Sequence, residues 1–166
     1  MPRLRPFFLA CALAAGCAAP AARAHLPLES SAQIETAPEG LEITVTLSQG
    51  YAAALLDSAP GLPLTSEDFD AVRPALLAAA PRVGAITDAS GETPPPARVL
   101  VSLTTEGEIR YLFVYPAAFV PAAFGIPALA SLPRGYFCTV SDQRTHPPGR
   151  VILHKDRPRH EFTLLP

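Results

Sequence analysis

The segment Leu41–Ser48 constrains the fold most strongly, because apolar and polar residues alternate along it without interruption. Successive side chains of a β-strand point to opposite faces, so this pattern predicts a half-buried strand. The side chains expected in the core are the aliphatic ones: Leu41, Ile43, Val45 and Leu47. Residues 28–36 predict a weaker strand before it, and Glu39-Gly40 supplies the turn between the two. A chain with this element is expected to build a sheet.

Further strand patterns follow along the chain. Residues 99–104 and 108–114 alternate in the same way and flank a turn that contains Gly107, which predicts a hairpin. Residues 136–140 predict another strand. Residues 150–154 and 161–165 predict a final hairpin around the charged turn 155–159.

The period changes between residues 51 and 80, where a helical insertion is expected. Residues 51–57 are a short helix candidate, and Thr65 is a hydroxyl cap followed by acids that suit the positive end of a second helix. This helix start explains the acidic cluster better than a calcium or catalytic site does: Glu67, Asp68 and Asp70. Pro74 should kink or divide the helix, which should end by Pro81.

Six or seven short strands with frequent turn signals predict a mainly β fold, an antiparallel, Ig-like β-sandwich with a short helical insertion at about 51–80. Residues 25–166 are expected to form a single domain, since the length suits one core. Residues 117–133 predict an irregular crossing with strand pieces, broken by prolines and a glycine. Pro94–Pro96 predicts a stiff, polyproline-like spacer.

The N-terminus has the features of an export signal. Arg3 and Arg5 precede an uncharged stretch, residues 7–19, that is too short to span a bilayer. Ala22-Arg23-Ala24 supplies the small-x-small pattern of a cleavage site, so residues 1–24 are predicted to be removed and His25 to become the first residue. The mature chain is therefore expected in the periplasm or outside the cell, without a transmembrane span.

A second processing route is open. Ala14-Ala15-Gly16-Cys17 resembles a bacterial lipobox, in which the cysteine is lipidated and becomes the first residue. In this alternative the protein is a lipoprotein anchored to the membrane through Cys17.

Signal removal changes the charge of the chain. The full sequence has 13 basic and 15 acidic residues, and loss of three arginines leaves a net charge of about −5 with histidine neutral. Phosphate binding needs a basic face, so nucleic acid is not an expected partner. Residues 134–166 nevertheless contain six basic against three acidic residues. They form either one face of an unevenly charged domain or a surface for an anionic partner or lipid.

The common sequence signatures of enzymes are missing: there is no G-x-S-x-G elbow, P-loop, G-x-G-x-x-G, C-x-x-C or H-E-x-x-H motif. After cleavage the only cysteine is Cys138, which cannot form an internal disulfide and is expected to be a small buried hydrophobic residue.

Histidines are the candidate metal ligands. If the last hairpin turned symmetrically about Arg157, His154 and His160 would lie opposite each other, with Cβ atoms about 5 Å apart. His25 at a new N-terminus would add an amine and an imidazole, and such nitrogen ligands suit copper, nickel or zinc. The competing interpretation is that His154 and His160 are exposed polar positions beside a basic turn that repels cations.

Two family resemblances point to the bacterial envelope. The start Ala24-His25-Leu26-Pro27-Leu28, with Pro38 and the strand from Leu41, resembles periplasmic CopC-type copper carriers, which implies a small β-sandwich with His25 as a metal ligand. Residues 101–104, the hairpin to Tyr115-Pro116, and residues 129–136 resemble small exported proteins that accompany HupE/UreJ-type membrane proteins. That resemblance implies nickel or cobalt handling beside a membrane protein and no catalytic residue.

Three functions follow as hypotheses. The first is an exported, non-enzymatic β-sandwich that binds a partner protein or is an accessory protein of the envelope. The second is a periplasmic metal carrier that uses His25, His154 and His160. The third is a hydrolase whose catalytic groups come from distant positions, which would require a cleft with convergent polar groups.

Overall fold

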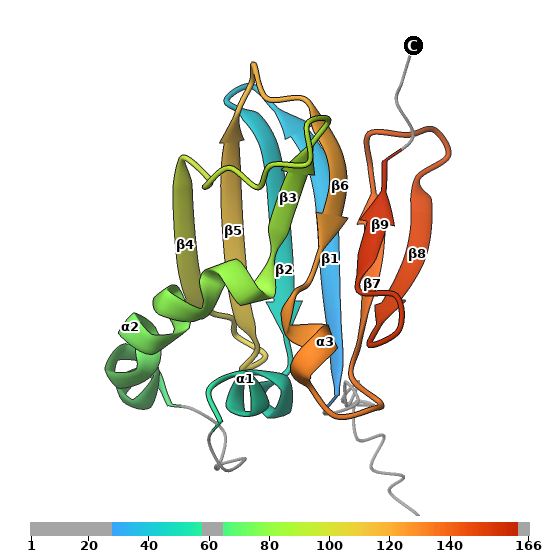
Figure 1. The fold of residues 1–166 in the computed structure, drawn as a ribbon. Coiled ribbons are helices and arrows are strands. Elements are labelled where there is room, and N and C mark those ends of the chain that lie inside the picture. The colour runs from blue at the N-terminus through green and yellow to red at the C-terminus, as the bar shows by residue number, and fades with distance from the viewer. Residues whose placement is uncertain (1–27, 58–64, 163–166) are drawn as a thin grey trace, which may run out of the picture.

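The larger of two β-sheets contains the strands that the alternating patterns predicted. The computed structural model describes residues 28–57 and 65–162. In this part of the chain six strands pair in the order β4-β5-β2-β1-β7-β8 (Figure 1). Their bounds are Glu29–Ala37 for β1, Gly40–Leu47 for β2, Arg98–Leu103 for β4, Ile109–Pro116 for β5, Phe137–Asp142 for β7 and Gly149–His154 for β8.

The predicted core face of β2 is confirmed: Leu41, Ile43, Val45 and Leu47 are all buried. The β4–β5 hairpin is confirmed as well, and Ile109, Tyr111 and Phe113 of β5 are almost completely buried. The turn between β1 and β2 requires glycine. Gly40 has φ +139°, and a Cβ there would lie 2.0 Å from the carbonyl oxygen of Tyr115 on β5. The hydrophobic alternation therefore fixed which face of this sheet is buried.

The sheet is mixed, which corrects the prediction of all-antiparallel pairing. β1 pairs with β2 in antiparallel fashion but with β7 in parallel. Glu29 is aligned with Phe137 and Ile34 with Asp142 along this parallel pair. Alternation looks the same in both pairings, because the period of two does not depend on strand direction.

The smaller sheet consists of β3 (Ala85–Asp88), β6 (Pro121–Gly125) and β9 (Arg159–Glu161), in the order β3-β6-β9. Figure 1 shows it in front of the larger sheet, and buried side chains of both sheets belong to one hydrophobic cluster. The mainly β fold class is confirmed, and its two sheets with a few short helices are consistent with a sandwich-like fold. The Ig-like strand topology stays a prediction.

The predicted final hairpin is wrong. The chain leaves β8 through a tight turn in which the backbones of His154 and Arg157 bond to each other in both directions, at 3.1 and 2.9 Å. It then crosses to the other sheet, where β9 pairs with β6 instead of β8. Residues 163–165 of the predicted strand lie outside the described residues.

The helical insertion consists of α1 (Gln49–Leu55) and α2 (Ser66–Val83), and α3 (Ala128–Ser131) is a further short helix. The predicted cap is confirmed, because Thr65 and Asp68 form a reciprocal capping box. α2 continues through Pro74 with a bend in its axis (Figure 1). It also passes Pro81 and ends at Val83, so the predicted end was wrong. Ala79, Ala80 and Val83 are buried around Pro81, and this packing offsets the lost hydrogen bond.

None of the helices in residues 28–57 and 65–162 combines the length and the apolar character needed to cross a membrane.

Candidate binding cleft

A cleft of about 360 Å³ opens where the smaller sheet ends. Its floor is formed by Val99 of β4 and by Phe113 and Tyr115 of β5, on the inner face of the larger sheet. Figure 1 shows how the surroundings are arranged: α2 lies below, β3 lies to one side, and the chain after β3 crosses in front of β5 to reach β4. We name this hollow the apolar cleft. Its complete lining is Leu77, Ala80, Pro81, Gly84, Ala85, Thr93, Pro94, Pro95, Pro96, Val99, Phe113 and Tyr115.

The cleft lies where α2 and the chain between β3 and β4, instead of the smaller sheet, cover the larger sheet. Tyr111 of β5 anchors the helix, since its buried hydroxyl donates a 2.9 Å hydrogen bond to the carbonyl of Leu76. Gly84, directly after α2, leaves room over the floor: a Cβ there would lie 3.0 Å from the Phe113 ring. α2 is therefore bonded to β5 at Tyr111 and the covering chain at Val114, where the Ala97 N–H donates a 2.8 Å hydrogen bond, and the hollow lies between these contacts.

The chemistry of the lining is apolar. Among the residues that form it, none is charged, and only Thr93 and Tyr115 have polar side chains. Tyr115 is buried and stacks on Phe119 with ring centroids 5.3 Å apart. Burial raises the pKa of the Tyr115 phenol above its ordinary value, so it is neutral near pH 7. Such a lining can bind an apolar group but has no general acid, base or nucleophile suited to hydrolysis.

One wall of the apolar cleft is the tract Pro94–Pro96, which is rigid because each ring fixes its own φ angle. The opposite wall includes Ala85 of β3, which is an edge strand in its sheet. Within the described residues, the outer side of β3 has no strand partner. Prolines lack the N–H group that would pair with such an edge, so the tract cannot close the sheet on this side.

A second hollow of about 190 Å³ continues from the first and shares Ala85 and Thr93 with it. It runs over β3 toward Pro158 and Arg159 of the chain that enters β9. The Arg159 guanidinium forms an exposed ion pair with Glu161 at 2.8 Å. The second hollow therefore crosses the end of the smaller sheet from β3 toward β9, away from the outer edge of β3.

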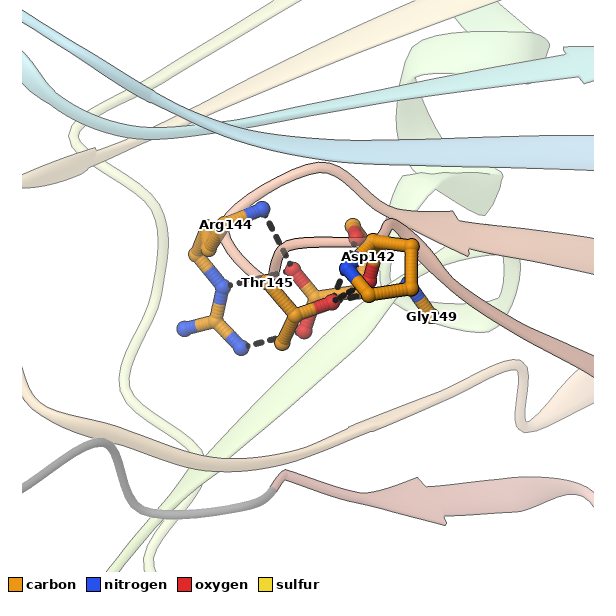
Figure 2. A network of polar contacts seen from close by, with 5 residues as sticks. Asp142, Arg144, Thr145 and Gly149 are labelled. Carbon is orange, nitrogen blue, oxygen red and sulfur yellow. Dashed lines mark hydrogen bonds and ion pairs between the residues drawn. The ribbon is translucent and has the colours of Figure 1, made fainter.

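The other side of the fold is closed by a buried ion pair. Arg144 donates two hydrogen bonds to the Asp142 carboxylate, at 2.9 Å from Nε and 2.7 Å from Nη2, and a third at 3.1 Å from its backbone N–H (Figure 2). In the same loop, the Thr145 hydroxyl accepts a 2.8 Å hydrogen bond from the N–H of Gly149. The Arg144 guanidinium also lies over the Phe162 ring, 4.1 Å from its centroid. This network connects the β7–β8 loop to the end of the smaller sheet.

The charge of this network has a direct effect on two pKa values. Burial alone would raise the pKa of Asp142, but the hydrogen bonds and charge of Arg144 hold it below its ordinary value. Burial lowers the pKa of His160, and the charges of Arg157 and Arg144 act in the same direction against the opposing carboxylates of Asp142 and Glu161. The arrangement is a structural ion pair, because its carboxylate oxygens are already engaged by Arg144.

The structure does not bring the predicted metal ligands together across one ladder. His154 is aligned with Phe137 in the larger sheet, whereas His160 is aligned with Phe124 in the smaller one. His154 is exposed and its Nδ1 accepts a 3.3 Å hydrogen bond from the N–H of Asp156. The expected opposition of His154 and His160 was wrong because the hairpin does not form. His25 lies outside the described residues.

In residues 28–57 and 65–162, no group of three or more His, Cys, Asp or Glu side chains is placed to hold a metal ion. Copper, nickel or zinc binding through His25, His154 and His160 stays a prediction, which calorimetry with Cu(II) and Zn(II) on the processed protein tests.

The cysteine predictions have different outcomes. Cys138 is fully buried on β7, and burial raises the pKa of its thiol to about 12. It is the small buried hydrophobic residue that was expected and is not a reactive thiolate near pH 7. Cys17, the alternative lipidation site, lies outside the described residues.

Sequence reasoning missed the apolar cleft. It identified the proline tract and the strands of the floor, but as a spacer and as separate core elements. The one local signal was the run Pro94–Pro96 directly before an apolar strand. Comparison with known proteins adds no relative: no protein-family model matches the chain, and no curated protein matches it.

Proposed function

We propose that this protein is an exported, non-enzymatic accessory protein of the cell envelope that binds a partner protein through the apolar cleft. The observation that carries the proposal is an apolar hollow of about 360 Å³ beside the free edge of a strand. Its volume is within the range of ligand-binding pockets, about 300–1,000 Å³.

The proposed occupant is an extended segment of the partner that carries an uncharged aliphatic or aromatic side chain. The uncharged lining favours such a side chain, because a charged group would lose its water without gaining a partner. Among the described residues no strand pairs with the outer side of β3, where the Asp88 N–H donates a 2.9 Å hydrogen bond to the carbonyl of Glu92. An extended backbone that exchanged for this bond could pair with the edge, and the adjacent hollow would then receive one side chain of the added strand. Strand addition supplies backbone hydrogen bonds, and the apolar cleft supplies specificity.

A phage-displayed peptide selection on the processed protein tests this function. We expect enriched peptides that share an apolar anchor residue within an extended, uncharged stretch. Their affinity, measured by calorimetry, should fall at least about tenfold in Leu77→Asp, because Leu77 lines the apolar cleft. Leu77 is 39% exposed, so this change should leave the fold intact.

Leu100→Asp is the matched control. Leu100 is 45% exposed on β4 but does not belong to the lining. Unchanged peptide affinity in Leu100→Asp together with the loss in Leu77→Asp would support the proposal. Equal affinities of the two variants, or a selection that enriches no apolar anchor, would contradict it.

A further inference from the structure

Three basic residues from two distant segments lie at one end of the molecule. Arg134 follows α3, whereas Lys155 and Arg157 belong to the turn between β8 and β9, and all three residues are exposed. The Lys155 ammonium donates a 3.2 Å hydrogen bond to the carbonyl of Leu132, two residues before Arg134. This bond fixes the turn against the segment after α3. We name these three residues the basic end.

The turn that presents Lys155 and Arg157 is held by its own backbone. His154 and Arg157 exchange two N–H···O bonds, and the Asp156 N–H donates to His154 Nδ1 at 3.3 Å. The backbone that carries the two cations is therefore preorganised, which lowers the entropic cost of placing the turn on a surface.

The chain enters the described fold at the same end. The Phe137 N–H donates to the carbonyl of Leu28 at 3.2 Å, and Leu28 lies beside Gly135, the neighbour of Arg134. Figure 1 shows the start of β1, α3 and the β8–β9 turn together at this end. In the lipoprotein alternative, Cys17 is lipidated. The eleven residues after Cys17, up to Leu28, would then span at most about 40 Å. The anchor would then be within reach of the basic end.

The distribution of charge makes this end distinct. Residues 28–133 contain 12 acidic residues and four arginines, so most of the chain is repelled by an anionic surface. Two other C-terminal arginines are already paired, Arg144 with Asp142 and Arg159 with Glu161. Two carboxylates belong to the same end: Asp156 in the turn itself, and Glu29, the first residue of β1, which is aligned with Phe137.

We infer that the basic end docks on a membrane surface through anionic phospholipid headgroups. Exposed lysines and arginines gain free energy near such a surface, and the gain decreases with salt. Because residues 28–133 carry a net negative charge, docking through these three cations would also orient the molecule. This inference does not depend on what the apolar cleft binds.

Vesicle co-sedimentation tests the inference with protein purified as the exporting cell processes it. Vesicles of phosphatidylcholine containing about one-third phosphatidylglycerol are compared with pure phosphatidylcholine at low salt. The ratio of the two affinities reports docking to anionic lipid even if the N-terminus carries an acyl chain, since acyl insertion contributes to both. We expect preference for the anionic vesicles, lost as salt is raised.

The decisive variant changes Arg134, Lys155 and Arg157 to Gln, and should reduce the anionic preference about a hundredfold, or about fivefold for each charge. The matched control changes Arg73, Arg98 and Arg110 to Gln, which alters the net charge equally on other surfaces. We expect the control to keep its preference. Thermal unfolding of both variants checks that each is folded.

Asp156→Asn keeps the test decisive if the triple variant does not fold. It removes one opposing carboxylate and should strengthen binding to anionic vesicles a few-fold. Equal losses in the two triple variants, no preference for phosphatidylglycerol, or no gain in Asp156→Asn would overturn the inference. Binding to soluble polyglutamate without binding to vesicles would also overturn it and would assign the basic end to an acidic protein.

Discussion

The two sides of the interior are closed in different ways. Near β7 and β8, the Asp142–Arg144 pair and the Phe162 ring join the β7–β8 loop to the end of the smaller sheet. Near β4 and β5 the smaller sheet has ended, and α2 with the tract Pro94–Pro96 leaves the apolar cleft. The same larger sheet thus has a closed side and an open side. The comparison shows that a cleft can form where the second layer of a two-sheet fold does not cover the first.

The largest expected effect is on the closed side. Arg144→Ala leaves the Asp142 carboxylate, only 5% exposed, without its partner, and should reduce the free energy of unfolding by about 3–5 kcal/mol. Arg98→Ala removes an exposed pair with Glu39 and should change it by less than about 1 kcal/mol. Urea denaturation measures both values. Similar losses in the two variants would contradict the assignment of Arg144 as the residue that closes this side.

Two adjacent leucines of α2 are expected to have different roles on the open side, one in the stability of the core and the other in the lining of the apolar cleft. Leu76 is fully buried, so Leu76→Ala should cost about 3 kcal/mol of unfolding free energy. Leu77→Ala should cost less than about 1 kcal/mol, because that side chain is 39% exposed. Chemical denaturation compares them. A stability loss in Leu77→Ala as large as that in Leu76→Ala would show that Leu77 is a core residue and not a free part of the lining.

A smaller effect is expected at the start of the same helix. Thr65→Ala removes the hydroxyl that accepts a 3.1 Å hydrogen bond from the Asp68 N–H and should lower the unfolding free energy by about 1 kcal/mol. Ser66→Ala, one position later, is the control and should change it by less than about 0.5 kcal/mol. A Tm in Thr65→Ala equal to that of the control would mean that the capping box contributes nothing.

The smallest expected effect is a pH dependence on the closed side. Burial lowers the pKa of His160 in the folded state, so the unfolded chain binds its proton more readily. The stability that this provides is present above the ordinary histidine pKa of about 6.5 and decreases as the pH falls from there toward the folded-state value.

His160→Gln should therefore reduce the fall in Tm between about pH 7.5 and about pH 5.5. His154→Gln removes an imidazole from an exposed position at the end of β8 and serves as the control. Identical pH slopes for His160→Gln and the unmodified protein would rule out His160 as the source.

The sequence predicted the larger sheet well, because its strands are long enough for alternation to be seen. Leu41–Leu47 and the β4–β5 hairpin have this property. The smaller sheet was predicted only in part: β6 lies within residues 117–133, where strand pieces were expected, but β3 was missed and β9 was misplaced. Its strands have only three to five residues, as in Arg159–Glu161, and none follows a clear period. Their pairing is set by contacts between distant segments, so β9 joined β6 where a local hairpin with β8 was expected.

The apolar cleft was beyond local prediction for the same reason. Pro94–Pro96 is visible in the sequence, but its role as a wall depends on where the chain crosses β4 and β5. Asp142 and Arg144 are two residues apart, and this spacing alone does not predict a buried ion pair. The pair is buried because Arg144 also lies over the Phe162 ring, which comes from a distant segment. The expected opposition of His154 and His160 was wrong because it required a symmetric hairpin, which does not form.

The most direct test of partner binding by the apolar cleft is an NMR titration with a selected peptide, in which amide shifts are mapped onto the fold. The account predicts that the largest changes occur at Gly84, Ala85 and Thr93, which line the apolar cleft. Residues of β8 on the closed side, such as Arg150 and Ile152, should not change. Shifts centred on β8, or spread evenly over both sides, would contradict it.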